Sequence, residues 1–272
     1  MTLTAVTANF GCASPAAQGV QARRRKRAEQ HAHMLRAREV DLVFAQEIPA
    51  SGWIESWRSA GYTVITEQQT PYAVRSAVIS RHAVTPVSLD SAAYHGSYLA
   101  AASIELGCGP VTLVSVHASP SPLTSEYIAS GTALIRGAKQ RVVGREGQWW
   151  DADFVLGTLA DLVSDGHHVL AAGDYNECLR WDETHPGTTW GQQYFENVRQ
   201  AGLISVTSAH WTHEQQTYLG SDAGYQLDHV LASADVAPLI ESVTLQSWEP
   251  SDVESGTSPD HAWIGFSIID RA

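Results

Sequence analysis

Acidic, amide and imidazole side chains recur where the apolar runs of this 272-residue sequence begin or end. Such positions hold side chains rigidly at the edge of a β-sheet, where a cleft can form. Carboxylates and imidazoles suit general acid–base catalysis, and carboxylate oxygens suit a hard divalent cation. The residues concerned are Asn9, Gln46, Glu47, His117, Asp174, Asn176, Asp228, His229, Asp260 and His261.

Each of these residues also has a structural interpretation when it is taken alone. A glutamate after a strand, such as Glu47, can be a solvated carboxylate, and a histidine such as His117 can be a hydrogen-bonded structural residue. Asp and Asn favour turns, so residues 174–176 could form one, and Asp260 could be a cap. If strand geometry persists through residues 174–176, the first and third side chains lie on the same side.

Motifs of other hydrolases are incomplete or missing from the sequence. His213 and Glu214 resemble the start of a zinc-protease helix, but the second histidine of that motif is absent. There is no Gly-x-Ser-x-Gly nucleophile elbow and no phosphate-binding loop that ends in Gly-Lys-Ser/Thr. These absences argue against a zinc protease, a serine hydrolase of that type and a phosphate-loop nucleotide hydrolase.

The elements that must position these side chains are short β-like runs and a smaller number of helical segments. Helix-favouring composition and three- or four-residue apolar spacing predict helices at residues 16–39, 134–143, 154–163 and 192–200. A long polar loop is expected after Asn176. Apolar or alternating stretches predict strands at residues 3–9, 40–45, 62–66, 74–80, 84–89, 98–106, 111–117, 167–172, 203–206, 226–231, 241–248 and 261–269.

This order of elements favours an α/β (α+β) sandwich with mixed, mainly antiparallel sheets, because strands outnumber helices and helices fall between groups of strands. A regular barrel of alternating strands and helices would need a helix after each strand, and residues 62–117 lack them. The sequence contains no repeat and no linker-like stretch. Residues 1–272 are therefore expected to form a single domain.

The chain is acidic overall, with a net charge of −12, and 44% of its residues are hydrophobic. That composition provides a core and excludes a disordered chain. Seven of the 17 basic residues lie between residues 23 and 38, whereas a binder of long duplex DNA usually presents a broad basic face. Residues 23–27 are either a phosphate-contacting surface or the solvated face of a helix.

Several features bear on the compartment of the protein. No stretch approaches the roughly 20 apolar residues that a membrane helix requires, and the first residues show neither a basic leader nor a long apolar block. The cysteines are too widely spaced for a disulfide framework or a zinc pattern; they are Cys12, Cys108 and Cys178. We expect a cytoplasmic protein without a membrane span, and nothing in the sequence indicates a protein partner.

Taken together, these motifs resemble in type and order those of the endonuclease/exonuclease/phosphatase superfamily, which has the fold of pancreatic deoxyribonuclease. The resemblance spans nearly the whole chain, and its strongest matches are Gln46-Glu47, Gly173-Asp174-Tyr175-Asn176 and Asp260-His261. It implies a four-layered sandwich, in which two packed β-sheets are flanked by helices. It also implies hydrolysis of a phosphoester with a divalent cation, Mg²⁺ or Mn²⁺.

For the cation and the attacking water, the resemblance implies roles for four residues. Glu47 and Asp260 would bind the cation, because hard cations prefer oxygen ligands and need only one or two carboxylates. Asp174 would orient and deprotonate the attacking water. Asn9 would donate to the phosphate or orient Asp174.

For the phosphate itself, the resemblance implies roles for four further residues. Asn176 would hold a non-bridging oxygen. His261, paired with Asp228, would be an imidazolium beside the phosphate, because a buried carboxylate raises the pKa of a histidine and fixes its tautomer. His117 would be the second phosphate-facing histidine.

Three features depart from the family pattern. Pro259, rather than a serine, precedes Asp260, and Ser258 lies one place earlier. Gly11 stands where the family often has a second acidic residue, so one possible metal ligand is missing and the number of metal ions stays open. The phosphate-binding tyrosine of some members has three candidates in this sequence, Tyr94, Tyr127 and Tyr175.

The sequence leaves the substrate open, because substrate choice depends on loops around the shared site. In the loop after Asn176, Arg180, Trp181 and Trp190 could stack on a base, or the tryptophans could pack the loop onto the body. We expect a metal-dependent phosphodiesterase or nuclease that acts on nucleic acid or a nucleotide-like diester. The alternatives are a phosphomonoesterase for a small metabolite, such as an inositol phosphate, and a catalytically silent binding module of the same fold.

Overall fold

The computed structural model describes residues 1–12, 18–49, 52–66, 76–89, 99–120, 150–247 and 260–271. The helix expected at residues 134–143 lies outside these residues, as do Tyr94, Tyr127, Ser258 and Pro259. Within the described residues, the strands form two six-stranded sheets, which we call sheet A and sheet B. No helix in these ranges is long and apolar enough to span a bilayer.

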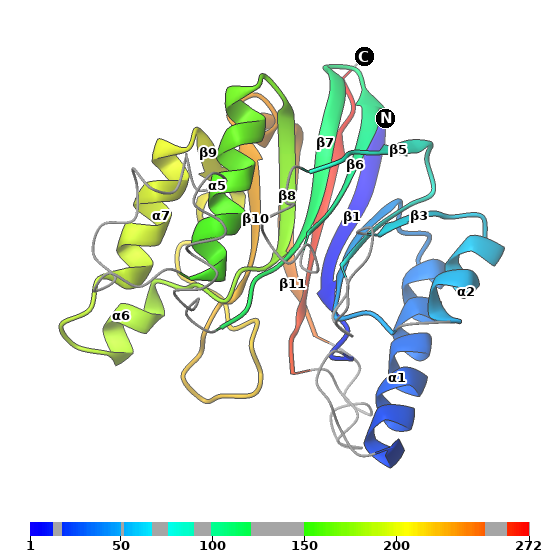
Figure 1. Ribbon diagram of the computed structural model, residues 1–272, viewed down its shortest axis with the longest axis horizontal. Coiled ribbons are helices and arrows are strands. Elements are labelled where there is room, and N and C mark those ends of the chain that lie inside the picture. Colours follow the sequence, from blue (N-terminus) through cyan, green and yellow to red (C-terminus); the bar gives the residue numbers. More distant parts are fainter. Residues whose placement is uncertain are drawn as a thin grey trace.

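Sheet A places the first and last strands of the chain side by side (Figure 1). Its order is β11-β12-β1-β2-β4-β3, and β1 pairs with β2 in parallel and with β12 in antiparallel fashion. The strands are β1 (Thr2–Asn9), β2 (Leu42–Gln46), β3 (Thr63–Thr66), β4 (Ala77–Ser80), β11 (Ile240–Gln246) and β12 (Trp263–Ile269).

Sheet B has the order β5-β6-β7-β8-β10-β9, in which β7 and β8 are parallel and β8 and β10 are antiparallel. Each sheet thus combines one parallel pair with antiparallel neighbours, which confirms the mixed, mainly antiparallel sheets that the sequence predicts. The strands are β5 (Val84–Pro86), β6 (Leu99–Leu106), β7 (Gly109–His117), β8 (His168–Asp174), β9 (Leu203–Ser205) and β10 (Asp228–Ser233).

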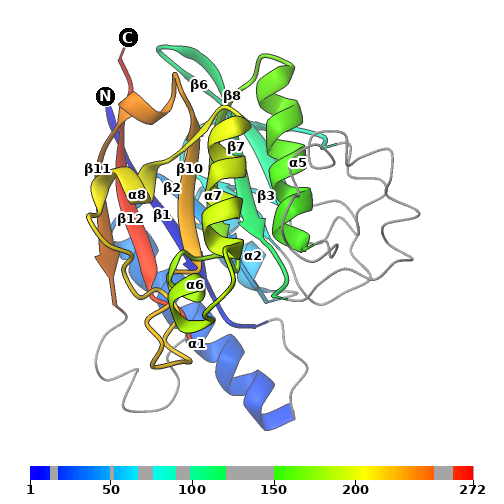
Figure 2. The ribbon, with the colours of Figure 1, turned by 90° about the vertical axis from the view of Figure 1, so that its left-hand side faces the viewer.

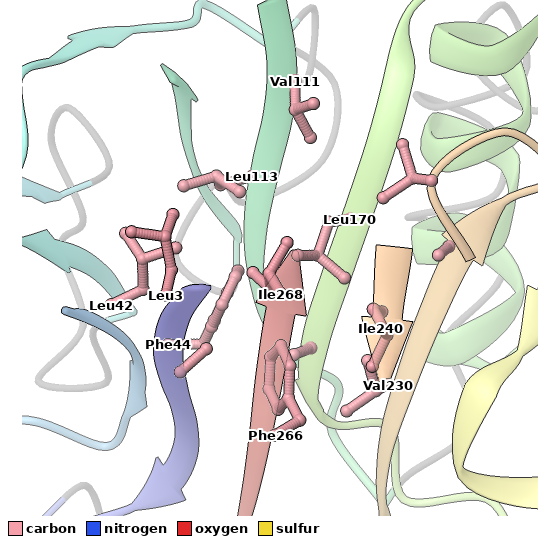
Figure 3. Packing of buried hydrophobic residues seen from close by; sticks show 14 of the residues in the cluster. Leu3, Leu42, Phe44, Val111, Leu113, Leu170, Val230, Ile240, Phe266 and Ile268 are labelled. Atoms are coloured by element: carbon pink, nitrogen blue, oxygen red, sulfur yellow. The ribbon is translucent and has the colours of Figure 1, made fainter. Parts of the chain in front are cut away.

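The two sheets pack face to face through apolar side chains. In Figure 3, Leu3, Phe44 and Ile268 of sheet A lie opposite Leu113 and Leu170 of sheet B, in one buried cluster. Complete burial of one such leucine stabilises the fold by roughly 1.5–3 kcal/mol. Strands β2 and β8, whose residues 42–45 and 169–172 read as continuous apolar runs, are covered on both faces.

Helices cover the outer face of each sheet and complete four layers, which confirms the sandwich that the resemblance implies. On sheet A, Trp53 is buried between the two helices and donates its indole N–H to the Ala28 carbonyl. Figure 2 shows the other two helices lying across β7, β8 and β10 of sheet B. The helices are α1 (Gln18–Ala37) and α2 (Trp53–Ser59) on sheet A, and α5 (Asp151–Ser164) and α7 (Trp190–Gln200) on sheet B.

The structure differs from the sequence prediction at its short elements. The loop after Asn176 contains a helix, α6 (Arg180–Thr184), and α2 was not expected. The strand predicted at residues 203–206 gives way at Val206 to α8 (Val206–His210), and a 3₁₀ turn, η1 (Ala237–Leu239), lies between β10 and β11. Helices of five to seven residues present too few turns for an apolar period to be recognised.

Candidate active site

Strand ends meet at one edge of the sandwich, at the lower end of the ribbon in Figure 1. In sheet A, the parallel pairing of β1 with β2 sets Asn9 beside Gln46. In sheet B, the register sets Asp174 of β8 between His117 of β7 and Asp228 of β10. Because hydrogen-bonded strands lie about 5 Å apart, this register by itself brings three titratable side chains together.

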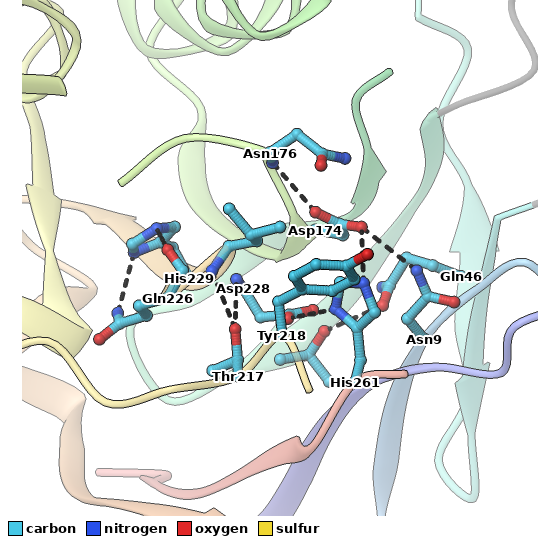
Figure 4. Close-up of polar contacts among 12 residues, drawn as sticks. Asn9, Gln46, Asp174, Asn176, Thr217, Tyr218, Gln226, Asp228, His229 and His261 are labelled. Atoms are coloured by element: carbon cyan, nitrogen blue, oxygen red, sulfur yellow. Dashed lines mark hydrogen bonds and ion pairs between the residues drawn. The ribbon is translucent and has the colours of Figure 1, made fainter. Parts of the chain in front are cut away.

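The Asp174 carboxylate lies at the centre of this group (Figure 4). Its Oδ2 is 3.2 Å from Asn9 Nδ2, 3.6 Å from His261 Nε2 and 3.9 Å from His117 Nε2. Its Oδ1 accepts a hydrogen bond of 3.0 Å from the backbone N–H of Asn176. One buried carboxylate therefore meets an amide and two imidazoles that are far apart in the sequence.

His261 and Asp228 form a buried pair beside Asp174. His261 Nδ1 lies 2.7 Å from Asp228 Oδ2. The Asp228 backbone N–H donates to Thr217 Oγ1 at 3.0 Å, and the Tyr218 ring centroid lies 5.2 Å from that of His261. Because the Nδ1 proton of His261 is directed at Asp228, its Nε2 is the nitrogen that faces Asp174.

Glu47 connects sheet A to the same network. Its Oε1 lies 3.3 Å from Asn9 Nδ2 and 3.3 Å from His117 Nε2. Asn9 Nδ2 thus lies within hydrogen-bond distance of both Glu47 and Asp174, while its Oδ1 accepts the Gly11 N–H at 2.9 Å and orients the amide. The two sheets therefore contribute to one continuous polar network.

The environment shifts the pKa values of the central groups. Burial raises the pKa of Asp174 to about 6, although the charge of His261 opposes the rise. For His261, burial acts to lower the pKa, but the charges of Asp228 and Asp174 outweigh it and raise the pKa to about 10. At neutral pH the site therefore holds an ionised carboxylate that still accepts a proton readily, beside an imidazolium.

Two further buried histidines differ in the direction of their pKa shift. Burial acts to lower the pKa of His117, but the hydrogen bond with Glu47 and the charge of Asp174 raise it above the usual value. His229 follows Asp228 in β10 and therefore faces the other side of the sheet. Burial lowers the pKa of His229, whose Nε2 lies 2.8 Å from the Glu177 carbonyl. His117 thus belongs to the site, and His229 supports the fold.

Asn176 does not continue β8, which ends at Asp174. Its φ of +52° turns the chain, and its Nδ2 donates to the Ala118 carbonyl at 2.6 Å. The strand geometry that would place the Asp174 and Asn176 side chains on one side therefore does not persist. A hydrogen bond from the Asn176 N–H to the Asp174 carboxylate holds the two residues together instead.

Glu47, through its backbone, and Asp260, through its carboxylate, lie beside the turn at Gly11. The Glu47 carbonyl accepts the Cys12 N–H at 3.0 Å, and Asp260 Oδ1 lies 3.6 Å from the position that a Cβ on Gly11 would take. No group of three or more His, Cys, Asp or Glu side chains in the described part of the chain is arranged to hold a metal ion. Mg²⁺ commonly uses one or two carboxylates and completes its shell with water and substrate phosphate, so Glu47 and the exposed Asp260 suit it.

The loop after Asn176 is held by contacts of its own. The Trp181 ring stacks on His185 with centroids 3.8 Å apart, and it lies nearly parallel to Trp190 at 6.4 Å. Glu214 accepts the backbone N–H groups of residues 179 and 180 at 2.7 and 2.8 Å. Both tryptophans are partly exposed, and Arg180 is exposed. The ordered loop therefore presents aromatic surface without being wholly packed away.

Thr217 and Tyr218 support the site but were not found from the sequence. They come from a polar segment without apolar periodicity, so no pattern marks them. Gln46 Nε2 donates to Ser115 Oγ at 3.0 Å and joins the two sheets beneath the site.

Tyr175, one of the tyrosine candidates, is fully buried in the core beside α5 and α7, and burial raises its pKa well above the usual value. Tyr175 therefore does not face the polar network.

The sequence matches the family model described as "Endonuclease/Exonuclease/phosphatase family" over residues 10–252. Asn9 and His261 lie outside the matched range, although the structure brings both to Asp174. A comparison with curated proteins found no match.

Solved structures of similar fold cover almost the whole chain. A 3′-5′ exonuclease from Neisseria meningitidis has 15% identity and a TM-score of 0.67, over 98% of this chain and 99% of that one. An AP endonuclease from Archaeoglobus fulgidus has 14% identity and a TM-score of 0.69, over 99% and 100%. TDP2 from C. elegans has 14% identity and a TM-score of 0.61, over 98% and 75%. At these identities the likeness shows a shared fold.

Proposed function

The chain belongs to the Endonuclease/Exonuclease/phosphatase family, whose members hydrolyse phosphoester bonds, and we propose that it hydrolyses a phosphodiester with the help of a divalent cation. The observation that carries this proposal is the position of Asp174. Its buried carboxylate lies within 3.9 Å of the Asn9 amide and of the His117 and His261 imidazoles.

Asp174 is the group that orients and deprotonates the attacking water. Its raised pKa, about 6, suits this role, because a base whose pKa lies just below the working pH is ionised and yet accepts a proton well. The Asn9 amide on Oδ2 and the Asn176 N–H on Oδ1 fix the plane of the carboxylate. A water held by this carboxylate would therefore meet the phosphorus from a defined direction.

His261 is the cation that stabilises the phosphate. Its pKa of about 10 keeps the ring protonated at neutral pH, and Asp228 accepts the hydrogen bond from Nδ1–H. The Nε2–H remains to donate to a phosphate oxygen, where it stabilises the negative charge that grows in the transition state. Asp228 acts through His261 and is a positioning residue.

His117 and Asn176 complete the polar surface that faces the phosphate. His117, whose pKa is raised by Glu47 and Asp174 against the effect of burial, supplies a second donor or the acid for the leaving oxygen. Asn176 Nδ2 carries a second N–H besides the one given to Ala118, and it holds a non-bridging oxygen. Donors from three different segments would thus contact one phosphate.

Glu47 and Asp260 are the residues that would hold the cation through their carboxylate oxygens. When bound, a divalent cation neutralises charge that develops on the phosphate and lowers the pKa of a bound water. Mg²⁺ or Mn²⁺ suits oxygen ligands of this kind. The proposal is supported by the place of Asp260 at the Gly11 turn and of Glu47 in the network that includes Asn9.

For the substrate, we favour nucleic acid or a nucleotide-like diester. Two of the similar structures are an exonuclease and an AP endonuclease. Arg180, Trp181 and Trp190 lie in the ordered loop after Asn176, and aromatic rings stack on bases of any sequence. The net charge of −12 disfavours tight non-specific binding of long duplex DNA.

A reducing compartment, the cytoplasm, fits the thiols of the chain. Cys12, Cys108 and Cys178 are all free, and Cys108 is exposed. Burial raises the pKa of Cys12 to about 11 and that of Cys178 to about 12, so both remain protonated and unreactive. Fractionation of cells that produce the protein should recover it with cytoplasmic markers.

A substrate panel with Mg²⁺ or Mn²⁺ tests the proposal. The panel contains plasmid DNA, single-stranded DNA, RNA, bis-p-nitrophenyl phosphate and p-nitrophenyl phosphate. We expect metal-dependent cleavage of at least one diester by the wild-type chain and loss of that cleavage in Asp174→Ala, His261→Ala and Glu47→Ala. The folded variants also control for contaminating nucleases, because they pass through the same purification.

Two results would replace the proposal by an alternative. Cleavage of p-nitrophenyl phosphate alone would indicate a phosphomonoesterase that acts on a small metabolite. Bound metal without turnover of any substrate in the panel would indicate a catalytically silent binding module.

A further inference from the structure

We propose that Arg27 is a built-in cation of the candidate site: its guanidinium, seated on the Gly11 turn next to Asp260, supplies the positive charge that a second metal ion would otherwise bring, so the chain binds one divalent cation. This inference rests on the proposed function, because Glu47 and Asp260 are metal ligands only under that proposal. It also divides the basic segment 23–27 in two. Arg23, Arg25 and Lys26 are exposed, whereas Arg27 is 7% exposed and turned inward.

The guanidinium of Arg27 is seated on the Gly11 turn. Its Nη2 donates to the Phe10 carbonyl at 3.0 Å and to the Gly11 carbonyl at 3.3 Å. A Cβ on Gly11 would lie 2.6 Å from the same Nη2, closer than real contacts allow. Glycine at position 11, with φ of +62°, therefore leaves the space into which the Arg27 side chain extends.

Asp260, one of the carboxylates proposed to bind metal, lies against the same turn as this guanidinium. The position of a Cβ on Gly11 lies near both Arg27 Nη2 and Asp260 Oδ1, so both groups lie against the same side of the turn. Burial lowers the pKa of Arg27, and nearby Cys12, Asp260 and Glu47 oppose that effect. An arginine remains protonated even so, because its ordinary pKa lies far above neutral pH.

A fixed positive charge at this place has two opposite consequences. It weakens the attraction of the two carboxylates for a further cation, since like charges a few ångströms apart repel. It strengthens the attraction for an anionic phosphate, whose oxygens match the planar donors of a guanidinium. A second metal ion would supply the same charge, so Arg27 makes that ion unnecessary.

Mn²⁺ binding to the whole chain, measured by calorimetry and electron paramagnetic resonance without substrate, tests the proposal. The wild type should bind one Mn²⁺. Arg27→Met should bind Mn²⁺ about tenfold more tightly, because one unit charge near the ion is removed. The same variant should bind inorganic phosphate more weakly in the presence of Mn²⁺. Arg27→Lys keeps the charge and should bind Mn²⁺ as the wild type does, and Arg25→Met is the control from the same helix.

A purely structural role for Arg27 predicts a different pattern. If its hydrogen bonds to Phe10 and Gly11 are what matters, Arg27→Met loosens the turn and weakens the binding of both Mn²⁺ and phosphate. Arg27→Lys, which lacks the forked donor group, would then fail to restore either affinity. That pattern, or two Mn²⁺ ions bound to the wild-type chain, would overturn the proposal.

A second pair of variants tests whether a second metal ion can bind at the Gly11 turn, and its expected result is a gain of binding rather than a loss. Gly11→Asp combined with Arg27→Ala supplies a carboxylate and removes the guanidinium, and it should bind a second Mn²⁺. Gly11→Asn with Arg27→Ala has the same backbone demand and the same opened space but no new charge, and it should bind one. Equal stoichiometry in the two double variants would contradict the proposal.

These measurements separate the inference from the proposed function. Failure of every substrate in the panel would remove the proposed catalysis, yet Mn²⁺ stoichiometry could still be measured. Conversely, a diesterase that binds two Mn²⁺ ions in the wild type would keep the proposed function and lose the role of Arg27.

Discussion

The two sheets end at the same edge of the molecule, but they bring different groups to it. Sheet B supplies His117, Asp174 and Asp228, which are neighbours in one cross-strand row and no more than 7% exposed. Sheet A supplies the Asn9 amide and, just after β2, the Glu47 carboxylate, which is partly exposed. Sheet B thus supplies a buried row of titratable groups, whereas sheet A supplies, at Glu47, a carboxylate that solvent can reach.

This difference indicates a division of labour between the sheets. Buried groups that contact one another shift each other's pKa, which suits them to hold and move protons. A carboxylate that water can reach remains available to a hydrated cation. Changes in the row of sheet B should therefore alter turnover and its pH dependence, and changes at Glu47 should alter the requirement for metal.

The largest effect is expected from Asp174→Asn, which keeps the shape of the side chain and removes its basicity. Turnover at saturating metal should fall by about 10²–10⁴, the usual contribution of a positioned acid or base. Mn²⁺ affinity should stay near the wild-type value. Steady-state kinetics and Mn²⁺ titration check both points, with Asp165→Asn on the exposed end of α5 as the control. Wild-type turnover in Asp174→Asn would contradict the proposed division of labour between the two sheets.

The next effect is expected from Glu47→Gln. The Mn²⁺ concentration that gives half-maximal activity should rise by at least about tenfold, because a charged ligand becomes a neutral one. Excess metal should restore much of the turnover, in contrast to Asp174→Asn. Glu39→Gln is a matched control, since Glu39 also has a positive φ, +54° against +50° for Glu47, but lies at the end of α1. An unchanged metal requirement in Glu47→Gln would show that the cation binds at another site.

A smaller effect, on pH dependence, is expected from Asp228→Asn. In the wild type, His261 has a folded-state pKa of about 10, above its usual 6.5. Without Asp228, the effect of burial is less opposed, so the pKa falls and the ring loses its proton at lower pH. The alkaline limb of the pH–rate profile should shift to lower pH by more than about one unit. Asp41→Asn, which removes the partner of the outlying His82, should leave the profile unchanged.

The same variant has a stability signature with a definite sign. A histidine whose folded-state pKa is raised stabilises the fold fully below its unfolded pKa of 6.5 and loses that contribution as the pH rises toward 10. The melting temperature of the wild type should therefore fall more steeply between pH 6.5 and 10 than that of Asp228→Asn. Parallel melting curves over this pH range would mean that Asp228 does not raise the pKa of His261.

The smallest effect is expected from Thr217→Val, behind the buried row. Thr217 Oγ1 accepts the backbone N–H groups of Leu227 and Asp228 at 2.9 and 3.0 Å, and valine leaves both without this acceptor. The free energy of unfolding should fall by about 1–3 kcal/mol, with a modest loss of turnover. Chemical denaturation checks the cost, and Thr85→Val on an exposed position of β5 should cost far less.

The strands that carry the site could be predicted from the sequence because their apolar residues form continuous or alternating runs. The strand expected at residues 3–9 is Thr2–Asn9, and that expected at 111–117 is Gly109–His117. Polar residues at the ends of such runs are conspicuous, so Asn9, His117 and Asp174 could be proposed from the sequence. The two sheets then bring these residues together.

The remaining contacts depend on geometry that no local pattern encodes. A buried Arg27 is indistinguishable from its exposed neighbours until the helix is placed on sheet A, since a run of five basic residues covers every face of a helix. Thr217 and Tyr218 reach the site through an irregular segment, and the turn at Asn176 depends on its hydrogen bonds to Asp174 and Ala118. These features follow from packing rather than from periodicity.

The most direct test of the central claim is a crystal structure of the chain with Mn²⁺ and inorganic phosphate, in which anomalous scattering locates the metal. We predict one Mn²⁺ peak beside the Glu47 carboxylate and a phosphate between it and His261, within reach of Asp174. Mn²⁺ and phosphate bound together at another surface, with these three side chains untouched, would contradict the account.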